Sequence, residues 1–174
     1  MITANLRVLT RVGLLAATAL ILFLFESAAP RPLPWMRLGL GNTAVLVALL
    51  LAGAPAAMGV SLIKILVGGL LTGALAGPTF AISGGAGVAS LLVMIVLHHL
   101  LSAQLSPVGI SVAGAACHQL SQIAIASVYL GHSNLWTLAP LFLISGVASG
   151  VLTGMIAYFA VHRLRQISPA EPAR

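Results

Sequence analysis

The polar side chains of one apolar stretch, residues 108–130, are the first candidates for chemistry in this sequence. His118, Gln119 and Gln122 occur together near its middle, within "GISVAGAACHQLSQIAIA". His118 and Gln122 are four residues apart, so a helix would present them on one face. An imidazole and two carboxamides supply both donors and acceptors of hydrogen bonds. They fit either a structural hydrogen-bond network or a ligand-binding site, and we favour ligand binding.

Lys64 is the second candidate, because it lies inside another apolar stretch, residues 56–76. An ammonium group in hydrocarbon costs a few kcal/mol on insertion scales. Its four-carbon stem can extend the charge to the lipid headgroups, or the charge can face a carboxylate, a carbonyl or a ligand inside the protein. We expect the second arrangement, with Lys64 as a substrate-binding residue.

The connection "ESAAPRPLPWMRLGLGN" is the third candidate, since it is polar between two apolar stretches and holds one of only two acidic residues. Pairing Glu26 with Arg37 would lower the cost of placing either charge near lipid. Asn42 can donate to and accept from a ligand. We therefore predict that Glu26, Arg37 and Asn42 belong to a binding site. Trp35 fits an aromatic belt at the membrane interface.

The sequence offers little for catalysis. It contains no aspartate, and Glu26 and Glu171 are far apart. The glycine-rich "SGGAGVAS" at 83–90 lacks the lysine of a phosphate-binding loop, and no metal-ligand spacing occurs. We expect no enzyme activity, no catalytic residue, no metal site and no cofactor.

Composition places the chain in a membrane. Of 174 residues, 60% are hydrophobic and only 6% are charged, against about 25% charged in an ordinary soluble domain. The single cysteine, Cys117, excludes an intrachain disulfide. The formal net charge of +6 comes from scattered or terminal residues and gives no basic stripe for nucleic acid.

Apolar runs separated by prolines, glycines and polar residues predict the elements that position these side chains. The runs are continuously apolar, which favours transmembrane helices over the alternating strands of a barrel. Prolines 55, 78 and 107 stand where helices would begin. We predict an all-α integral membrane protein, one domain over residues 1–174, with a tail at 163–174. Its six predicted spans cover residues 8–25, 38–54, 56–76, 79–101, 108–130 and 138–162.

The arginines indicate how the chain crosses the membrane. With six spans, one side holds the arginines at positions 7, 11, 163, 165 and 174, and the other holds those at 31 and 37. The positive-inside rule then places both termini in the cytoplasm. The first run also has features of a signal peptide, and we expect it to be retained.

Small residues at four-residue intervals predict faces for close helix packing. One ladder is Gly69, Gly73 and Gly77, and another is Gly146, Gly150 and Gly154. Gly13 and Ala17 form a shorter pair, which could pack within the bundle or against a partner protein.

The connection at 26–42, "GGLLTG", "FAISGGAGVASLLVM" and "GISVAGAACHQLSQIAIA" together give the chain a resemblance to a known family. Over residues 15–164 it resembles the Gx transporter family, whose members are often named heptaprenyl diphosphate synthase component I. These proteins are similar to the substrate-binding S components of energy-coupling factor (ECF) transporters. Many relatives carry asparagine in place of Gln119 and lysine in place of Arg37.

The resemblance implies a six-helix bundle in the bacterial inner membrane that binds a small molecule near its outer side. It implies partners too: a transmembrane coupling protein, docked on the Gly13 and Ala17 face, and a pair of ATPases. The cationic side chains indicate an anionic or hydrogen-bonding heterocyclic substrate. Two other functions remain open at this point, an accessory or scaffold subunit for a prenyltransferase or redox system, and a solitary ion-coupled carrier.

Overall fold

The computed structural model describes residues 2–30 and 36–167, and within these ranges the protein is helical without strands. The elements are α1 (Ile2–Ala28), α2 (Asn42–Leu71), α3 (Pro78–Leu101), α4 (Pro107–Leu130), the short 3-10 helix η1 (Ser133–Leu138) and α5 (Ala139–Ile167). Each of the five α-helices includes a stretch long and apolar enough to cross a membrane. The predicted all-α fold is therefore confirmed for the described residues, with helices able to cross a membrane.

The helix count differs from the prediction, because the second and third predicted spans are two arms of the single helix α2. The arms meet at Gly53, whose φ of 82° and ψ of −177° are not helical, and Pro55 follows directly. The first arm, from Asn42 to Gly53, reaches only about 16 Å at 1.5 Å per residue, roughly half of a hydrocarbon core. A separate second span is thus not confirmed.

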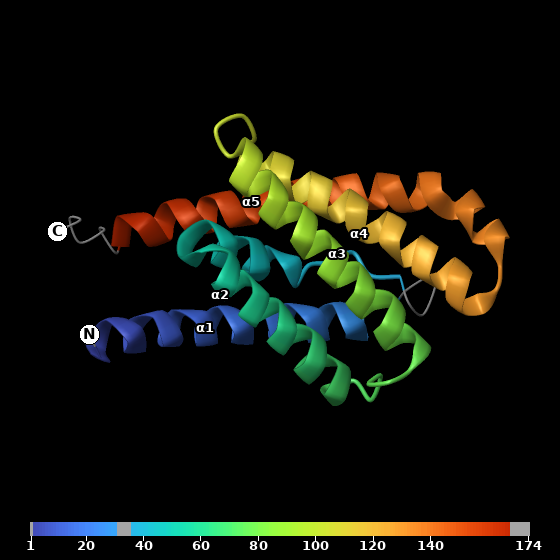
Figure 1. Cartoon of the computed structure of the whole chain (residues 1–174), viewed down its shortest axis with the longest axis horizontal. Coiled ribbons are helices and arrows are strands. Elements are labelled where there is room, and N and C mark those ends of the chain that lie inside the picture. The colour runs from blue at the N-terminus through green and yellow to red at the C-terminus, as the bar shows by residue number, and fades with distance from the viewer. Residues whose placement is uncertain (1, 31–35, 168–174) are drawn as a thin grey trace.

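The kink at Gly53 makes α2 double back on itself, which fixes where the ends of the chain lie (Figure 1). The first residues of α1 and the last turns of α5 lie at the same end of the molecule, with the kink and the α3–α4 loop. The segment at 36–41, the α2–α3 loop and η1 lie toward the opposite end. The bundle therefore has two distinct ends, called here the terminal end and the loop end.

Local sequence explains where the helices begin and end. Pro78 and Pro107 occupy the first turn of α3 and α4, where a missing amide donor leaves no bond unmade, as the sequence predicts. The hydroxyl of Ser106 caps α4 by accepting from the amide of Gly109 at 3.2 Å. α4 stops at Gly131, whose left-handed φ of 69° suits a residue without a Cβ. α5 continues to Ile167, so only 168–174 of the predicted tail follow it, outside the described residues.

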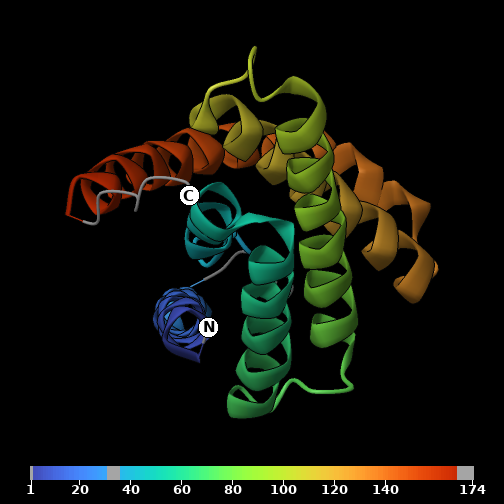
Figure 2. The same ribbon diagram turned by 60° about the vertical axis from the view of Figure 1, so that its left-hand side comes forward.

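The helices pack in sequence order, α1 on α2, α2 on α3, α3 on α4 and α4 on α5 (Figure 2). The closest approach is between α4 and α5. A Cβ added to Gly150 would lie 2.7 Å from Val112 Cα, and one added to Gly154 would lie 2.7 Å from Val108 Cα. A Cβ at Gly146 would lie 2.8 Å from Gln119 Cγ. This glycine ladder lets the two backbones meet.

The other predicted ladder is not a helix face, and that prediction needs correction. Gly69 is within α2 and faces the ring of Phe80, but α2 ends at Leu71. Gly73 lies beyond it with a left-handed φ of 67°, and Gly77 is the N-cap residue of α3. The two later glycines serve a turn, where a positive φ and a tight connection are required.

Candidate functional site

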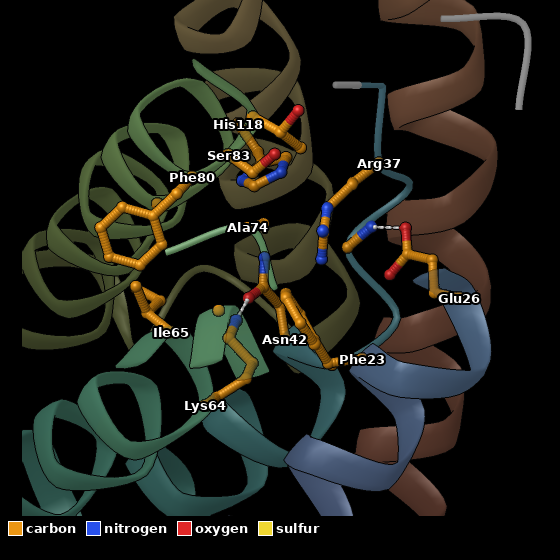
Figure 3. A pocket seen from close by; sticks show the side chains of 15 residues that line it. Phe23, Glu26, Arg37, Asn42, Lys64, Ile65, Ala74, Phe80, Ser83 and His118 are labelled. Atoms are coloured by element: carbon orange, nitrogen blue, oxygen red, sulfur yellow. Dashed lines mark hydrogen bonds between the residues drawn. The ribbon is translucent and has the colours of Figure 1, made fainter. Parts of the chain in front are cut away.

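A small polar cavity lies inside the bundle, between the C-terminal half of α1, both arms of α2, and parts of α3 and α4 (Figure 3). Its volume of about 30 Å³ is close to the space of one water molecule in the liquid. Five predicted binding residues line it: Glu26, Arg37, Asn42, Lys64 and His118. The other lining residues are Phe23, Gly39, Gly41, Ile65, Gly69, Ala74, Thr79, Phe80, Ser83 and Gly84.

Glu26 joins the end of α1 to the segment at 36–41. Its two carboxylate oxygens accept hydrogen bonds from the backbone amides of Gly39, at 2.8 Å, and Leu40, at 3.0 Å. Gly39 has a φ of 87°, a conformation that glycine adopts without strain and that turns its amide to the carboxylate. The buried carboxylate is therefore engaged by backbone. Its predicted pairing with the Arg37 guanidinium stays a prediction.

Gln119 and Gln122 hold the same segment from the side of α4. The carboxamide of Gln122 accepts from the Arg37 amide at 3.2 Å and donates to the Arg37 carbonyl at 3.0 Å. Gln119 also donates to that carbonyl, at 3.3 Å. Both glutamines are fully buried, and neither lines the cavity. Their geometry positions Arg37, whereas the sequence suggested direct contact with a ligand.

Ser149 of α5 adds a third support, since its hydroxyl donates to the carbonyl of Leu38 at 3.1 Å. Helices α1, α4 and α5 thus all bind the backbone of the segment at 36–41, through Glu26, the two glutamines and Ser149. The backbone of this connection is therefore fixed by side chains from three helices. Trp35, predicted at the membrane interface, lies outside the described residues.

Lys64 connects the two arms of α2. Its ammonium group donates a hydrogen bond to the side-chain carbonyl of Asn42, the first residue of α2 (Figure 3). Lys64 is 5% exposed, so its charge lies inside the bundle and does not extend to the headgroups. A Cβ added to Gly41 would lie 3.0 Å from the Lys64 stem, which explains a residue without a side chain there. An ammonium group has three N–H donors, so the bond to Asn42 leaves two N–H groups of Lys64 for other partners.

His118 reaches the cavity from the middle of α4, close to Ser83 of α3 in Figure 3. The side chain is 4% exposed, and neither ring nitrogen has a well-formed hydrogen bond with a described residue. The backbone of Ala86 lies near enough to interact with the ring. Buried polar groups are normally hydrogen-bonded, so an exception in a cavity indicates a place for a ligand or water.

Two aromatic rings complete the lining. The guanidinium carbon of Arg37 lies 4.0 Å from the centroid of the Phe23 ring, a cation–π contact. Phe80 lies against Gly69, where a Cβ would come within 2.7 Å of its ring. Sequence reasoning missed both, together with Ser83. Helical spacing gave a signal for Phe23 alone, because Phe23 precedes the predicted site residue Glu26 by three positions.

The side chains around the cavity do not form a metal site. Within the described ranges, no group of three or more histidine, cysteine, aspartate or glutamate side chains lies close enough to hold an ion.

The Gly13 and Ala17 pair lies on α1 toward the terminal end, away from the cavity. Both residues are exposed, and a Cβ added to Gly13 would meet nothing within 4 Å. The face that they share packs against no helix of the described bundle.

A known protein family matches this chain. Residues 15–160 match the sequence profile of the family described as heptaprenyl diphosphate synthase component I. The chain belongs to this family. The match spans α1 from its second half through most of α5, so it includes every residue that lines the cavity. No curated protein and no solved structure matches the chain. The family's description names a component of a synthase, and the Gx family resemblance seen in the sequence is thereby confirmed.

Proposed function

We propose that this protein is the membrane-embedded substrate-binding subunit of an ECF-type uptake transporter for a small organic nutrient. The single observation that carries the proposal is the cavity, in which a lysine, an arginine and a histidine are buried in a chain built for a membrane. Ionisable groups at membrane depth are costly, and they mark substrate or ion pathways.

The charges around the cavity favour an anionic or hydrogen-bonding heterocyclic substrate. Lys64 and Arg37 are cationic groups, and His118 adds a ring able to donate or accept. The one carboxylate, Glu26, already accepts two backbone hydrogen bonds. Two cations beside one carboxylate give the described lining a net positive charge that an anion would balance, and the rings of Phe23 and Phe80 offer flat surfaces to a heterocycle.

The cavity must widen before it can hold an organic molecule. In this conformation it has room for about one water molecule. Ala74 lines it from the α2–α3 connection and Thr79 from the first turn of α3, and the Phe80 ring lies against Gly69. We expect substrate to enter at the loop end by displacing Phe80 and this connection.

The exposed small-residue face of α1 supports a role for protein partners. Gly13 and Ala17 would let a transmembrane coupling protein approach the α1 backbone closely. That protein and a pair of ATPases would supply the energy. With the arginine-rich terminal end in the cytoplasm of a bacterial cell, the cavity opens toward the outer side of the inner membrane. The family's description names one component of a synthase, which agrees with a protein that works as part of a complex.

Two variants assayed in two ways test this proposal. Asn42→Ala removes the partner of Lys64 and should weaken capture of the small molecule by the purified protein, with co-purification of the partner proteins unchanged. Gly13→Leu should do the reverse, because it blocks close helix approach without touching the cavity.

The proposal fails if Gly13→Leu abolishes ligand capture while Asn42→Ala leaves it intact. Co-purification of a prenyltransferase or redox enzyme in place of ATPases would favour an accessory subunit. Uptake by the chain alone in liposomes would favour a solitary carrier.

A further inference from the structure

A second cavity lies at the terminal end of the bundle, away from the first. It has a volume of about 220 Å³, on the order of seven water molecules. Its lining comes from the first arm of α2, the last turn of α3, the α3–α4 loop, the first turn of α4 and the C-terminal turns of α5. The lining residues are Leu50, His98, Ser102, Leu105, Pro107, Ile110, Tyr158, Val161, His162 and Arg165.

The lining divides into a polar part and an apolar part. Arg165, His98, His162, Ser102 and Tyr158 supply hydrogen-bond donors. Leucines, isoleucine, valine and proline supply the rest, and no carboxylate of the described residues lines the cavity. One permanent cation among several neutral donors, next to an apolar wall, is suited to an anion that carries a hydrocarbon chain.

Three of the lining donors have hydrogen-bonding capacity beyond the bonds that they make with the described residues. The guanidinium of Arg165 donates from Nη2 to the carbonyl of Leu50 at 3.2 Å, which fixes it across the cavity and leaves further N–H groups. The Nδ1 nitrogen of His98 is buried and has no hydrogen-bond partner within the described ranges. The His162 ring stacks on Tyr158 with an interplanar angle of 11°, and its Nε2 shares a hydrogen bond of 3.0 Å with Gln166, which leaves Nδ1 for a ligand.

The position of the cavity in the bundle indicates which class of anion can reach it. Its polar residues lie at or near the ends of long apolar helices, and such helix ends meet the headgroup region when a helix crosses a membrane. Basic pockets between transmembrane helices at this depth bind the headgroups of anionic lipids. An arginine fork matches phosphate geometry with paired hydrogen bonds.

We propose that this cavity binds the phosphate group of an anionic phospholipid, with the first part of an acyl chain against Leu50, Leu105 and Ile110. The lipid would join the first arm of α2 to α5 at the terminal end of the bundle. This site does not depend on the function proposed for the first cavity.

The experiment measures lipid retained by the full chain. The protein is purified in mild detergent, offered phosphatidylglycerol or phosphatidylcholine, and bound lipid is counted by native mass spectrometry. We expect phosphatidylglycerol to be retained preferentially. Arg165→Gln should weaken that binding about 10-fold, the expected loss of one charged hydrogen-bonding group. Arg163→Gln is the matched control, since Arg163 is an arginine two residues away that is exposed like Arg165 but does not line the cavity.

His162→Phe provides a second variant that leaves the Leu50 contact intact, keeps a ring beside Tyr158 and removes the donor. This variant should also weaken phosphatidylglycerol binding. If Arg165→Gln does not fold, the result for His162→Phe tests the proposal in its place. Equal losses in Arg163→Gln and Arg165→Gln would overturn the proposal, as would equal retention of the two lipids. Displacement of the lipid by soluble glycerol phosphate at a similar concentration would overturn the lipid assignment in favour of a free phosphate ester.

Discussion

Replacing Gln122 with leucine should release the segment at 36–41 from α4. The wild-type carboxamide makes two hydrogen bonds with the backbone of Arg37 and is completely buried. In the variant the Arg37 carbonyl keeps the bond from Gln119, but the Arg37 amide loses its acceptor. Leaving one buried polar group unsatisfied costs about 1–3 kcal/mol, equivalent to roughly a 5- to 150-fold change in an equilibrium constant.

Hydrogen–deuterium exchange of the peptide that covers 36–42 measures this opening directly. We expect exchange there to accelerate by that factor in Gln122→Leu, with α3 unaffected. Gln166→Leu is the control, because Gln166 is exposed and its side chain bonds only His162 of the same helix. Unchanged exchange in Gln122→Leu, or an equal rise in Gln166→Leu, would refute the view that α4 positions this segment.

Three further predictions concern helix packing, the kink and Lys64. Gly150→Leu should prevent α4 and α5 from meeting and lower the melting temperature sharply, whereas Gly13→Leu should leave it unchanged, because only the first site has backbone within 2.7 Å. Gly53→Ala should destabilise the fold by about 1–3 kcal/mol, since its φ and ψ lie in a region that only glycine occupies readily, and Gly59→Ala measured alongside should be neutral. Lys64→Met should insert into membranes at least as well as wild type in a translocation assay, because removing a buried charge favours partitioning, and reduced insertion would contradict this.

Much of the fold was predictable because composition and hydropathy act over long runs. Continuous apolar sequence predicts helices, and prolines at 78 and 107 mark two of their starts. The doubling back of α2 was harder to assign. Gly53 and Pro55 indicate a break, but whether two arms form separate spans depends on a backbone angle that sequence does not specify.

The candidate site was predictable as far as polar residues in apolar surroundings reveal it. Lys64 and His118 stand out for that reason, and the structure brings both to one cavity. The sequence did not reveal that Gln119 and Gln122 hold the segment at 36–41, because their partner is backbone about 80 residues earlier in the chain. Phe80 looks like any apolar residue until the fold sets it beside the cavity.

The central claim is that the buried cationic cavity captures a small anionic molecule, and the most direct measurement is of what the protein carries. Wild type and Lys64→Met would be purified in mild detergent from the same cells, denatured, and the released small molecules compared by mass spectrometry. The account predicts an anionic molecule in amounts comparable to the wild-type protein and at least about 10-fold less in the variant, the loss expected for a charged hydrogen bond. The same molecule at equal amounts in both samples, or none in either, would contradict it.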